Sequence, residues 1–344
     1  MILSQNTIDN LQKAHVVNGI QPDQYLVKYR NIFELVEYRA HLQPDEIFIT
    51  YYSDSFPKTS LTYSEFKEKV FRTANLMKSH GVTPGSRIST ISYNHINTVI
   101  QYFAAWCIGA TVVPVNVSEE PDRIKYILQS SGTKLAFVKR EYYEKIEKIA
   151  HELEIDFIIH GNDELEPAAG IKIYEEELTK QSPVLELDDS LNPETEALIV
   201  YTSGTTGLPK GVVLTQYNLM VDADGISKWH GITKGNVMMC VLPIHHVNGT
   251  VVTVMTPMYT GCSLVLNQKF HTDTFFQRLR EENVNIVSVV PTLLQFLCHD
   301  YESKSEEVKR LSDLPAFRHI ICGAGPLTCE LVSKFENMFG LKIV

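Results

Sequence analysis

The stretch that decides the fold is Tyr201-Thr-Ser-Gly-Thr-Thr-Gly-Leu-Pro-Lys-Gly-Val212, near the middle of the 344-residue chain. A strand-like apolar run at residues 197–201 leads into it, and the stretch itself holds glycines, hydroxyl side chains and one lysine. Glycines let main-chain N–H groups approach an anion closely, because no Cβ stands in the way. Lys210 adds a compact positive charge on a long stem. This composition predicts a loop that grips a polyphosphate.

A Walker-type P-loop is the competing interpretation of this stretch. That motif requires Gly-x-x-x-x-Gly-Lys followed by Ser or Thr. Counted from Gly204, Pro209 stands where the motif needs its second glycine. Gly211 follows Lys210, where the motif needs a hydroxyl residue. The Walker interpretation therefore fails at both positions.

The stretch instead resembles the phosphate-binding signature of the adenylate-forming superfamily, which contains acyl-CoA synthetases, adenylation domains of nonribosomal peptide synthetases and firefly luciferase. Further segments resemble motifs of that family in the right order: Leu242-Pro-Ile-His-His-Val-Asn-Gly249, Val289-Val-Pro-Thr-Leu-Leu294 and Cys322-Gly-Ala-Gly-Pro-Leu327. The resemblance runs from about Asn31 to the last residue. It implies an α/β fold of layered parallel β-sheets flanked by helices, the N-terminal domain of the acyl-CoA synthetase and luciferase fold.

Helix and strand patterns alternate along nearly the whole chain, which is typical of parallel sheets covered by helices. A capping box at Thr62-Tyr-Ser-Glu65 predicts the start of one helix. Residues 161–193 are acidic, with scattered prolines and little periodicity. We therefore predict an N-terminal extension (1–30), a first α/β subdomain (31–160), a connecting segment (161–193) and a second α/β subdomain with the phosphate loop (194–344).

The last residues, Leu341-Lys-Ile-Val344, are typical of the opening of a strand. In the family this strand leads into an aromatic-Gly-x-Thr/Ser-Glu segment, whose glutamate helps to hold magnesium. A ribose-binding aspartate and a mobile C-terminal domain with the catalytic lysine follow. The resemblance therefore implies that the C-terminal domain is missing, and that this chain is an incomplete N-terminal portion, inactive or impaired by itself.

The net charge of −10 argues against nucleic acid as a partner, because binding phosphates requires a basic face. No apolar run approaches the ~20 residues of a transmembrane helix, and the first residues do not form a signal-peptide pattern. The six cysteines contain no C-x-x-C pair, which is typical of buried thiols in a reducing compartment. We therefore expect a cytoplasmic protein without a transmembrane segment.

The chemistry implied by the resemblance joins a carboxylate to the α-phosphate of ATP and releases pyrophosphate, with CoA as a later substrate. Both reactants are anions, so preorganised donors and a cation must offset their repulsion. The resemblance assigns the catalytic roles to Lys210, near the β- and γ-phosphates, and to His246, beside the acyl carboxylate. A hydroxyl of Ser203, Thr205 or Thr206 is expected to reach Mg²⁺, with Thr205 and Thr206 as the metal candidates.

The resemblance also implies two sets of binding residues. ATP is expected at the phosphate loop and at a stretch beneath the adenine: Thr202, Ser203, Gly204, Thr205, Thr206, Gly207, Lys210, Gly323, Ala324, Gly325 and Pro326. Pro326 is expected to open the next helix. The acid is expected at His245, His246, Asn248 and Gly249, where the small Gly249 leaves room for an acyl chain. Thr292 and Leu293 are further candidate walls of the acyl tunnel.

Several functions compete at this point. The leading hypothesis is an AMP-forming acyl-CoA synthetase that acts on a fatty or other apolar carboxylic acid. The main alternative is an adenylation unit that loads an acyl or aminoacyl group onto a carrier protein, and a third is a non-catalytic nucleotide-binding fragment. A hydrolase is disfavoured because no serine lies in a Gly-x-Ser-x-Gly elbow. A zinc site at the paired histidines is disfavoured because adjacent strand residues point to opposite faces.

Overall fold

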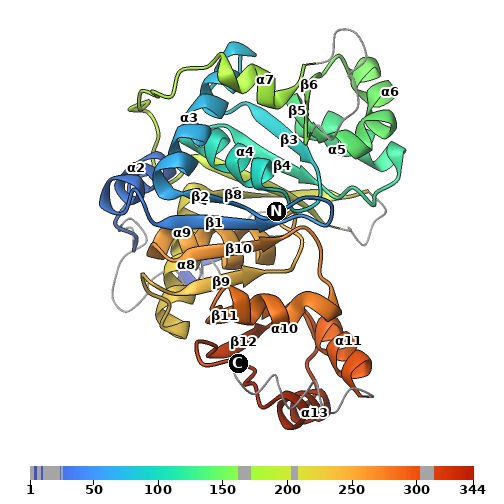
Figure 1. Cartoon of the computed structure of the whole chain (residues 1–344). Helices are drawn as coiled ribbons and strands as arrows, with labels where there is room; N and C mark the ends of the chain where they lie inside the picture. The colour runs from blue at the N-terminus through green and yellow to red at the C-terminus, as the bar shows by residue number, and fades with distance from the viewer. Residues whose placement is uncertain are drawn as a thin grey trace.

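Two six-stranded β-sheets form the framework of the computed structural model, which describes residues 4–5, 9–10, 24, 26–161, 172–202, 208–302 and 314–344 (Figure 1). The first sheet contains, in spatial order, β12 (His319–Cys322), β11 (Ile286–Val289), β9 (Val237–Cys240), β10 (Ser263–Asn267), β1 (Ile47–Tyr52) and β2 (Thr59–Thr62). The second sheet contains β6 (Asp156–His160), β5 (Thr133–Lys139), β3 (Arg87–Ile91), β4 (Thr111–Val115), β7 (Glu196–Thr202) and β8 (Lys210–Thr215).

Most neighbouring strands in both sheets run parallel, which confirms the predicted fold class. Each sheet also has an antiparallel strand at one edge, β2 beside β1 and β8 beside β7. Parallel strands are commonly buried on both faces. The all-buried strand β4 and the almost wholly buried β5 follow that rule.

Helices cover both faces of both sheets. Those between the sheets are α2 (Ile32–Leu42), α3 (Tyr63–Ser79), α4 (Ile96–Cys107), α8 (Gln216–His230), a π-helix (Asn248–Met255) and α9 (Thr256–Thr260). The second sheet's outer face carries α5 (Pro121–Ser131) and α6 (Tyr143–Leu153), preceded by a 3₁₀ turn (Arg140–Tyr142). The first sheet's outer face carries α10 (Thr272–Glu281), α11 (Pro291–Tyr301) and α13 (Cys329–Phe339), while α7 (Tyr174–Thr179) packs against α3.

The main core lies between the two sheets and is built largely from aromatic side chains. Phe48 of β1 meets Phe103 of α4, and Phe103 in turn meets Trp106, with ring centroids 6.4 and 5.1 Å apart. All three side chains are fully buried. The Trp106 indole donates a hydrogen bond of 2.8 Å to the Ala197 carbonyl of β7, so the aromatic ring keeps a polar partner inside the core. Helix α4 therefore joins the two sheets.

Local signals in the sequence predict several elements correctly. Thr62 and Glu65 form the predicted capping box at the start of α3. The predicted cysteine environment also holds for most of the set, since all cysteines are free thiols and Cys107, Cys240, Cys262 and Cys298 are buried. Residues 342–344 pair with β12, with Ile343 opposite Ile320, as expected for a strand. Within the described ranges, no helix combines the length and apolarity needed to cross a bilayer.

The strand order departs from the predicted division of the chain at residues 161–193. Strands β1 and β2 belong to the first sheet with β9 to β12, although they precede this segment. Strands β7 and β8 follow the segment and complete the second sheet. The predicted subdomain ranges stay a prediction, while the sheets themselves combine strands from both ranges. The pairing of β1 with β10 joins residues far apart in sequence and leaves no local pattern. Strands β2 and β8 were not predicted either, although each pairs with the strand directly before it.

Candidate active site

Three predicted motifs meet at one edge of the first sheet. Strands β9, β11 and β12 are parallel neighbours, so the segments after them emerge on the same side. The Ser288 hydroxyl of β11 donates 2.9 Å to Asn248 Oδ1, and the Gly323 N–H donates 3.3 Å to the Val289 carbonyl. A Cβ added at Gly325 would lie 3.5 Å from the ring of Pro291. The structure therefore brings the histidine motif, the Val-Pro-Thr motif and the glycine-rich segment together.

The segment after β9, residues 242–249, is called here the histidine turn, and a buried asparagine from the other sheet holds it in place. Asn94 Nδ2 donates 2.9 Å to the Leu242 carbonyl and 3.0 Å to the Asn267 carbonyl. Asn94 Oδ1 accepts a 2.8 Å hydrogen bond from the Ile244 N–H. One side chain thus satisfies three buried main-chain groups that would otherwise be costly to leave unpaired.

Gly249 packs the histidine turn against the π-helix that follows it. A Cβ at this position would lie 2.3 Å from the Pro243 carbonyl oxygen and 2.8 Å from Ile244 Cα, which no real side chain tolerates. The missing side chain therefore permits a close approach of two backbones. This differs from the predicted role of Gly249, because the space is filled by the turn and does not lie open for an acyl chain. Asn248 is the first residue of the π-helix, and its predicted role in binding the acid stays a prediction.

His245 and His246 stand at the tip of the histidine turn with ring centroids 4.3 Å apart. His245 is buried, and burial together with the neighbouring His246 lowers its pKa to about 3. The His246 side chain is accessible, although partial burial lowers its pKa below 6.5 as well. Both rings are therefore neutral near pH 7, and a neutral imidazole can donate a hydrogen bond to a carboxylate. His246 is thus accessible to a ligand and His245 is not, while the acid-binding roles of both histidines stay predictions.

The segment predicted to lie beneath adenine presents accessible backbone. Gly323 is half-buried and Ala324, Gly325 and Pro326 are exposed. Ala324 has φ +60°, the left-handed region, which a non-glycine residue adopts uncommonly. The prediction that Pro326 opens the next helix is wrong. Helix α13 begins at Cys329, because the Thr328 hydroxyl caps it by accepting from the Leu331 N–H.

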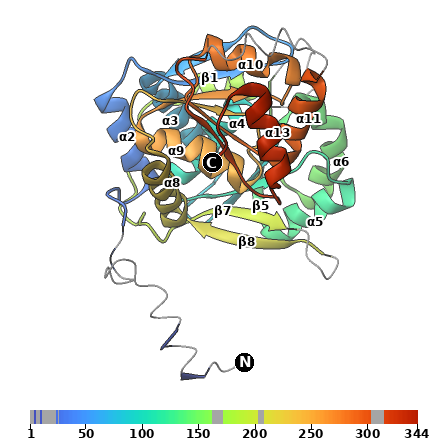
Figure 2. The ribbon, with the colours of Figure 1, turned by 90° about the horizontal axis from the view of Figure 1, so that it is seen from below.

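Lys210 opens β8 and is exposed on the edge of the second sheet, where β8 is the outermost strand (Figure 2). It stands opposite Thr202, the last residue of β7, in an antiparallel pair. We call β7 and β8 the lysine hairpin. The predicted loop residues Ser203, Gly204, Thr205, Thr206 and Gly207 lie outside the described residues, so the phosphate and magnesium contacts assigned to them stay predictions.

Helix α5 supports the lysine hairpin from the side. The hydroxyls of Ser130 and Tyr201 lie 2.7 Å apart, and the Tyr126 hydroxyl donates a longer 3.4 Å hydrogen bond to the Pro209 carbonyl. Tyr126 therefore reaches the residue directly before Lys210. The hydroxyl of Thr202 also reaches the Lys210 carbonyl at 3.5 Å. These contacts place the backbone of the hairpin but leave the lysine side chain accessible.

The predicted tunnel walls on α11 take different positions. Thr292 is exposed near the start of the helix, whereas Leu293 is partly buried against the core of the first sheet. Neither residue contacts the histidine turn through a hydrogen bond, and their role in binding an acid stays a prediction. Among the residues that the structure describes, no three His, Cys, Asp or Glu side chains form a metal site.

Sequence reasoning missed Asn94 and Ser288, the two side chains that fix the histidine turn. Asn94 follows β3, and polar residues after a parallel strand often belong to a site. The position of Asn94 after a strand therefore marked it as a site residue, but did not show which groups it would bind. Ser288 lies inside an otherwise apolar strand, where a lone hydroxyl requires a hydrogen-bond partner.

Comparison with known proteins identifies a family and several relatives of this chain. Residues 36–344 match the family described as AMP-binding enzymes. A mitochondrial malonate–CoA ligase of Xenopus laevis is 31% identical over 271 residues, which are 76% of this chain and 45% of that protein. A sulfoacetate–CoA ligase of Cupriavidus necator is 28% identical, over 77% of this chain and 49% of that protein. The chain thus spans about half the length of the curated relatives it matches.

Solved structures show the same fold. The N-terminal domain of FACL13 from Mycobacterium tuberculosis superposes with a TM-score of 0.77 at 23% identity, covering 92% of this chain and 75% of that domain. The anthranilate CoA ligase AuaEII, solved with anthranoyl-AMP, superposes with a TM-score of 0.81 at 20% identity, covering 92% of this chain and 60% of that one. At these identities the likeness establishes the fold.

Proposed function

Because this chain belongs to the family of AMP-binding enzymes, we propose that it is the N-terminal part of an AMP-forming ligase that joins a carboxylic acid to coenzyme A. The observation that carries the proposal is the meeting of three family motifs at the carboxyl edge of β9, β11 and β12. Such an edge is the usual ligand site of a parallel sheet. Relatives named as CoA ligases favour CoA over a carrier protein as the acceptor.

Within this proposal, the two reactive residues have separate tasks. The exposed Lys210 holds the β- and γ-phosphates of ATP and so offsets the charge of the departing pyrophosphate. His246, neutral and accessible, orients the attacking carboxylate by a hydrogen bond. Mg²⁺, when bound, would further neutralise the phosphates, with Thr205 and Thr206 as its candidate ligands. The backbone at Gly323 and Gly325 offers an accessible small-residue surface to the adenine.

Two classes of acid are candidates. The first is a fatty or other apolar acid, which the sequence resemblance favours. A short polar acid is the second candidate, since the relatives include ligases named for malonate, sulfoacetate and oxalate. The buried Ser288–Asn248 pair beside the histidine turn also places polar groups there. A cytoplasmic location remains a proposal as well, because one relative is named as mitochondrial.

Carboxylate-dependent exchange of pyrophosphate into ATP tests this proposal. The panel should contain malonate, sulfoacetate and short, medium, long and aromatic monocarboxylates, with Lys210→Ala as the control. Exchange that requires one class of acid and is lost in the control supports adenylation and identifies the acid. Exchange that proceeds equally without any acid would overturn the proposal. If the chain gives no exchange, the same panel should be run on the chain extended to the length of its relatives, and a negative result there overturns it too.

A further inference from the structure

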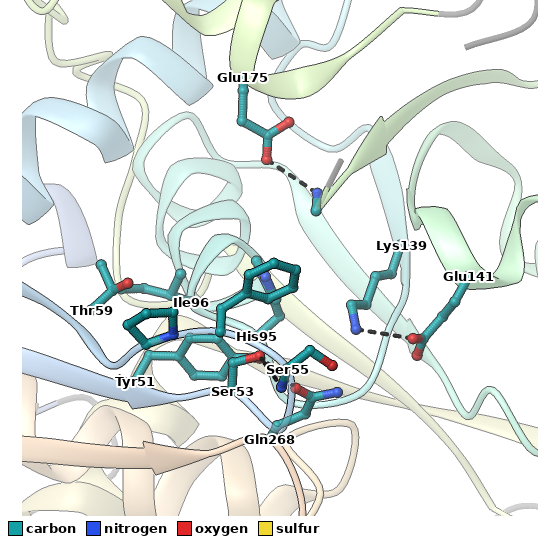
Figure 3. A pocket seen from close by; sticks show the side chains of 13 residues that line it. Tyr51, Ser53, Ser55, Thr59, His95, Ile96, Lys139, Glu141, Glu175 and Gln268 are labelled. Carbon is teal, nitrogen blue, oxygen red and sulfur yellow. Dashed lines mark hydrogen bonds and ion pairs between the residues drawn. The ribbon is translucent and has the colours of Figure 1, made fainter. Parts of the chain in front are cut away.

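A second pocket lies at the seam between the two sheets, at a different part of their carboxyl edges from the histidine turn (Figure 3). Tyr51, Ser53 and Gln268 line it from the ends of β1 and β10, and Lys139 lines it from the end of β5. His95, the N-cap of α4, and Glu175 of α7 complete the lining. Its volume is about 270 Å³. The pocket therefore suits a compact ligand.

Three hydrogen-bond donors converge on this seam pocket, and the first is a buried lysine. Lys139, at the end of β5, is only 6% exposed. Its Nζ lies 3.1 Å from a carboxylate oxygen of Glu141. A buried ammonium group requires an anionic partner, because leaving it unpaired costs several kcal/mol. Glu141 is a replaceable partner, since its side chain is 43% exposed and its carboxylate also has a hydrogen bond with Tyr142.

The second donor is Nε2 of His95, because a hydrogen bond at Nδ1 fixes the tautomer of the ring. Its Nδ1 accepts a 3.1 Å hydrogen bond from the Asn97 N–H and so caps α4. Burial lowers the pKa of His95 to about 3, so the ring is neutral. A neutral ring that accepts at Nδ1 carries its proton on Nε2. That Nε2 faces Gly161, where an added Cβ would lie 3.7 Å from it.

The third donor is the side-chain amide of Gln268, which is 7% exposed. Its Oε1 accepts three hydrogen bonds, from the Tyr51 hydroxyl at 3.3 Å, the Ser53 hydroxyl at 3.2 Å and the Asp54 N–H at 3.0 Å. These three contacts fix the orientation of the amide and engage only its oxygen. Gln268 therefore presents N–H groups on the pocket side.

A second buried histidine, His160, packs against His95. His160, at the end of β6, is fully buried, and neither ring nitrogen has a partner in the described part of the chain. Its ring centroid is 5.1 Å from that of His95. His160 packs behind His95 and does not itself line the seam pocket. The acidic Glu175 is already held by the Gly161 N–H at 3.1 Å and Asn97 Nδ2 at 2.8 Å.

We propose that the seam pocket binds a compact oxyanion, a phosphate or a short carboxylate, between Lys139, His95 and Gln268. The oxyanion takes the place of the Glu141 carboxylate at Lys139 Nζ. Charge-assisted hydrogen bonds from a lysine to such a group are about twice as strong as neutral ones. The site contains no residue of the histidine turn or the lysine hairpin, although Tyr51 in its wall donates to the Asn94 carbonyl, so it does not require the proposed ligase activity.

The test is isothermal titration of the 344-residue chain with inorganic phosphate and, separately, with acetate. All variants carry Lys210→Ala, which removes the phosphate-binding lysine proposed for the other site. We expect saturable binding that Lys139→Met weakens at least tenfold. His95→Asn keeps a side-chain oxygen to cap α4 but loses the Nε2 donor, so a smaller loss is expected. Lys134→Met is the matched control, because Lys134 is an exposed lysine of the same strand.

Glu141→Gln tests whether an oxyanion competes with the Glu141 carboxylate for Lys139, even if Lys139→Met fails to fold. It removes the competing carboxylate at the surface, so we expect binding to tighten severalfold. If only phosphate or only acetate binds, that result identifies which kind of oxyanion the pocket takes. No saturable binding of either ion, no tightening in Glu141→Gln, or an equal loss in Lys134→Met would overturn the proposal.

Discussion

The histidine turn and the lysine hairpin carry the two catalytic candidates in opposite ways. The turn is locked into the core by Asn94 from the other sheet and by the backbone contact at Gly249. The hairpin lies on a sheet edge, and Lys210 is exposed. A substitution in the turn therefore changes shape and chemistry together. A substitution of Lys210 changes chemistry alone. The contrast can be measured by comparing, for variants of each region, the loss of unfolding free energy with the loss of activity.

The largest loss of stability is expected from Asn94→Ala. The change leaves the Leu242 and Asn267 carbonyls and the Ile244 N–H without their buried partner. At about 1–3 kcal/mol for each unsatisfied group, we expect the free energy of unfolding to fall by about 4 kcal/mol. Urea denaturation measures it. A loss below about 1 kcal/mol would show that the turn does not depend on this asparagine.

Gly249→Ala should be the next most damaging change. The new Cβ would lie 2.3 Å from the Pro243 carbonyl, and backbone cannot yield as a side chain can. Overpacking of this kind costs about 1–3 kcal/mol. Gly323→Ala is the matched control, since a Cβ there meets nothing within 4 Å and should change stability by less than about 0.5 kcal/mol. Equal effects of the two variants in thermal unfolding would contradict the packing role of Gly249.

Acid should destabilise the histidine turn through His245. Its pKa is about 3 in the folded chain and about 6.5 when unfolded, so below pH 6.5 only the unfolded state takes up the proton. The stability contribution is complete above pH 6.5 and decreases by about 1.4 kcal/mol per pH unit as the pH falls. His245→Phe should remove this part of the pH dependence between pH 4 and 6.5. The exposed His299→Phe should leave it unchanged, and an identical slope in all three proteins would refute the assignment.

Lys210→Ala should have the smallest effect on stability, below about 0.5 kcal/mol, because the side chain is exposed. Its effect on pyrophosphate exchange should nevertheless be at least tenfold, about 1.4 kcal/mol of the barrier. Calorimetry and the exchange assay on the same preparation measure both. A large loss of stability would show that the lysine supports the hairpin itself, against the contrast drawn here.

Local sequence patterns predict part of this molecule well. The capping box at Thr62 predicts the start of α3, and the strand pattern of the last residues predicts their pairing with β12. Strand β1 escapes such reasoning because its pairing depends on a partner elsewhere in the chain. It pairs with β10, more than 200 residues away in sequence. The α/β class follows from alternation along the chain, whereas the exchange of strands between the two sheets does not.

The candidate site divides in the same way. The sequence motifs identify His246 and Lys210, because glycines and histidines at fixed spacing mark chemistry. They do not identify Asn94, whose function exists only where residue 94 meets residue 242 in space. They also misplace the start of α13 at Pro326, because the hydroxyl cap at Thr328 decides where that helix begins. A local motif does not show which distant backbone groups its residues contact in the folded chain.

The most direct test of the account is whether the lysine of one sheet and the histidine of the other serve one reaction. Pyrophosphate exchange should be measured for Lys210→Ala, His246→Ala and the double variant, with the acid that the wild-type chain or its extended form prefers. The account predicts at least tenfold losses in both single variants. It also predicts a loss in the double variant smaller than the product of the two, as for residues that act as a unit. Exchange that survives either single substitution unchanged would contradict it.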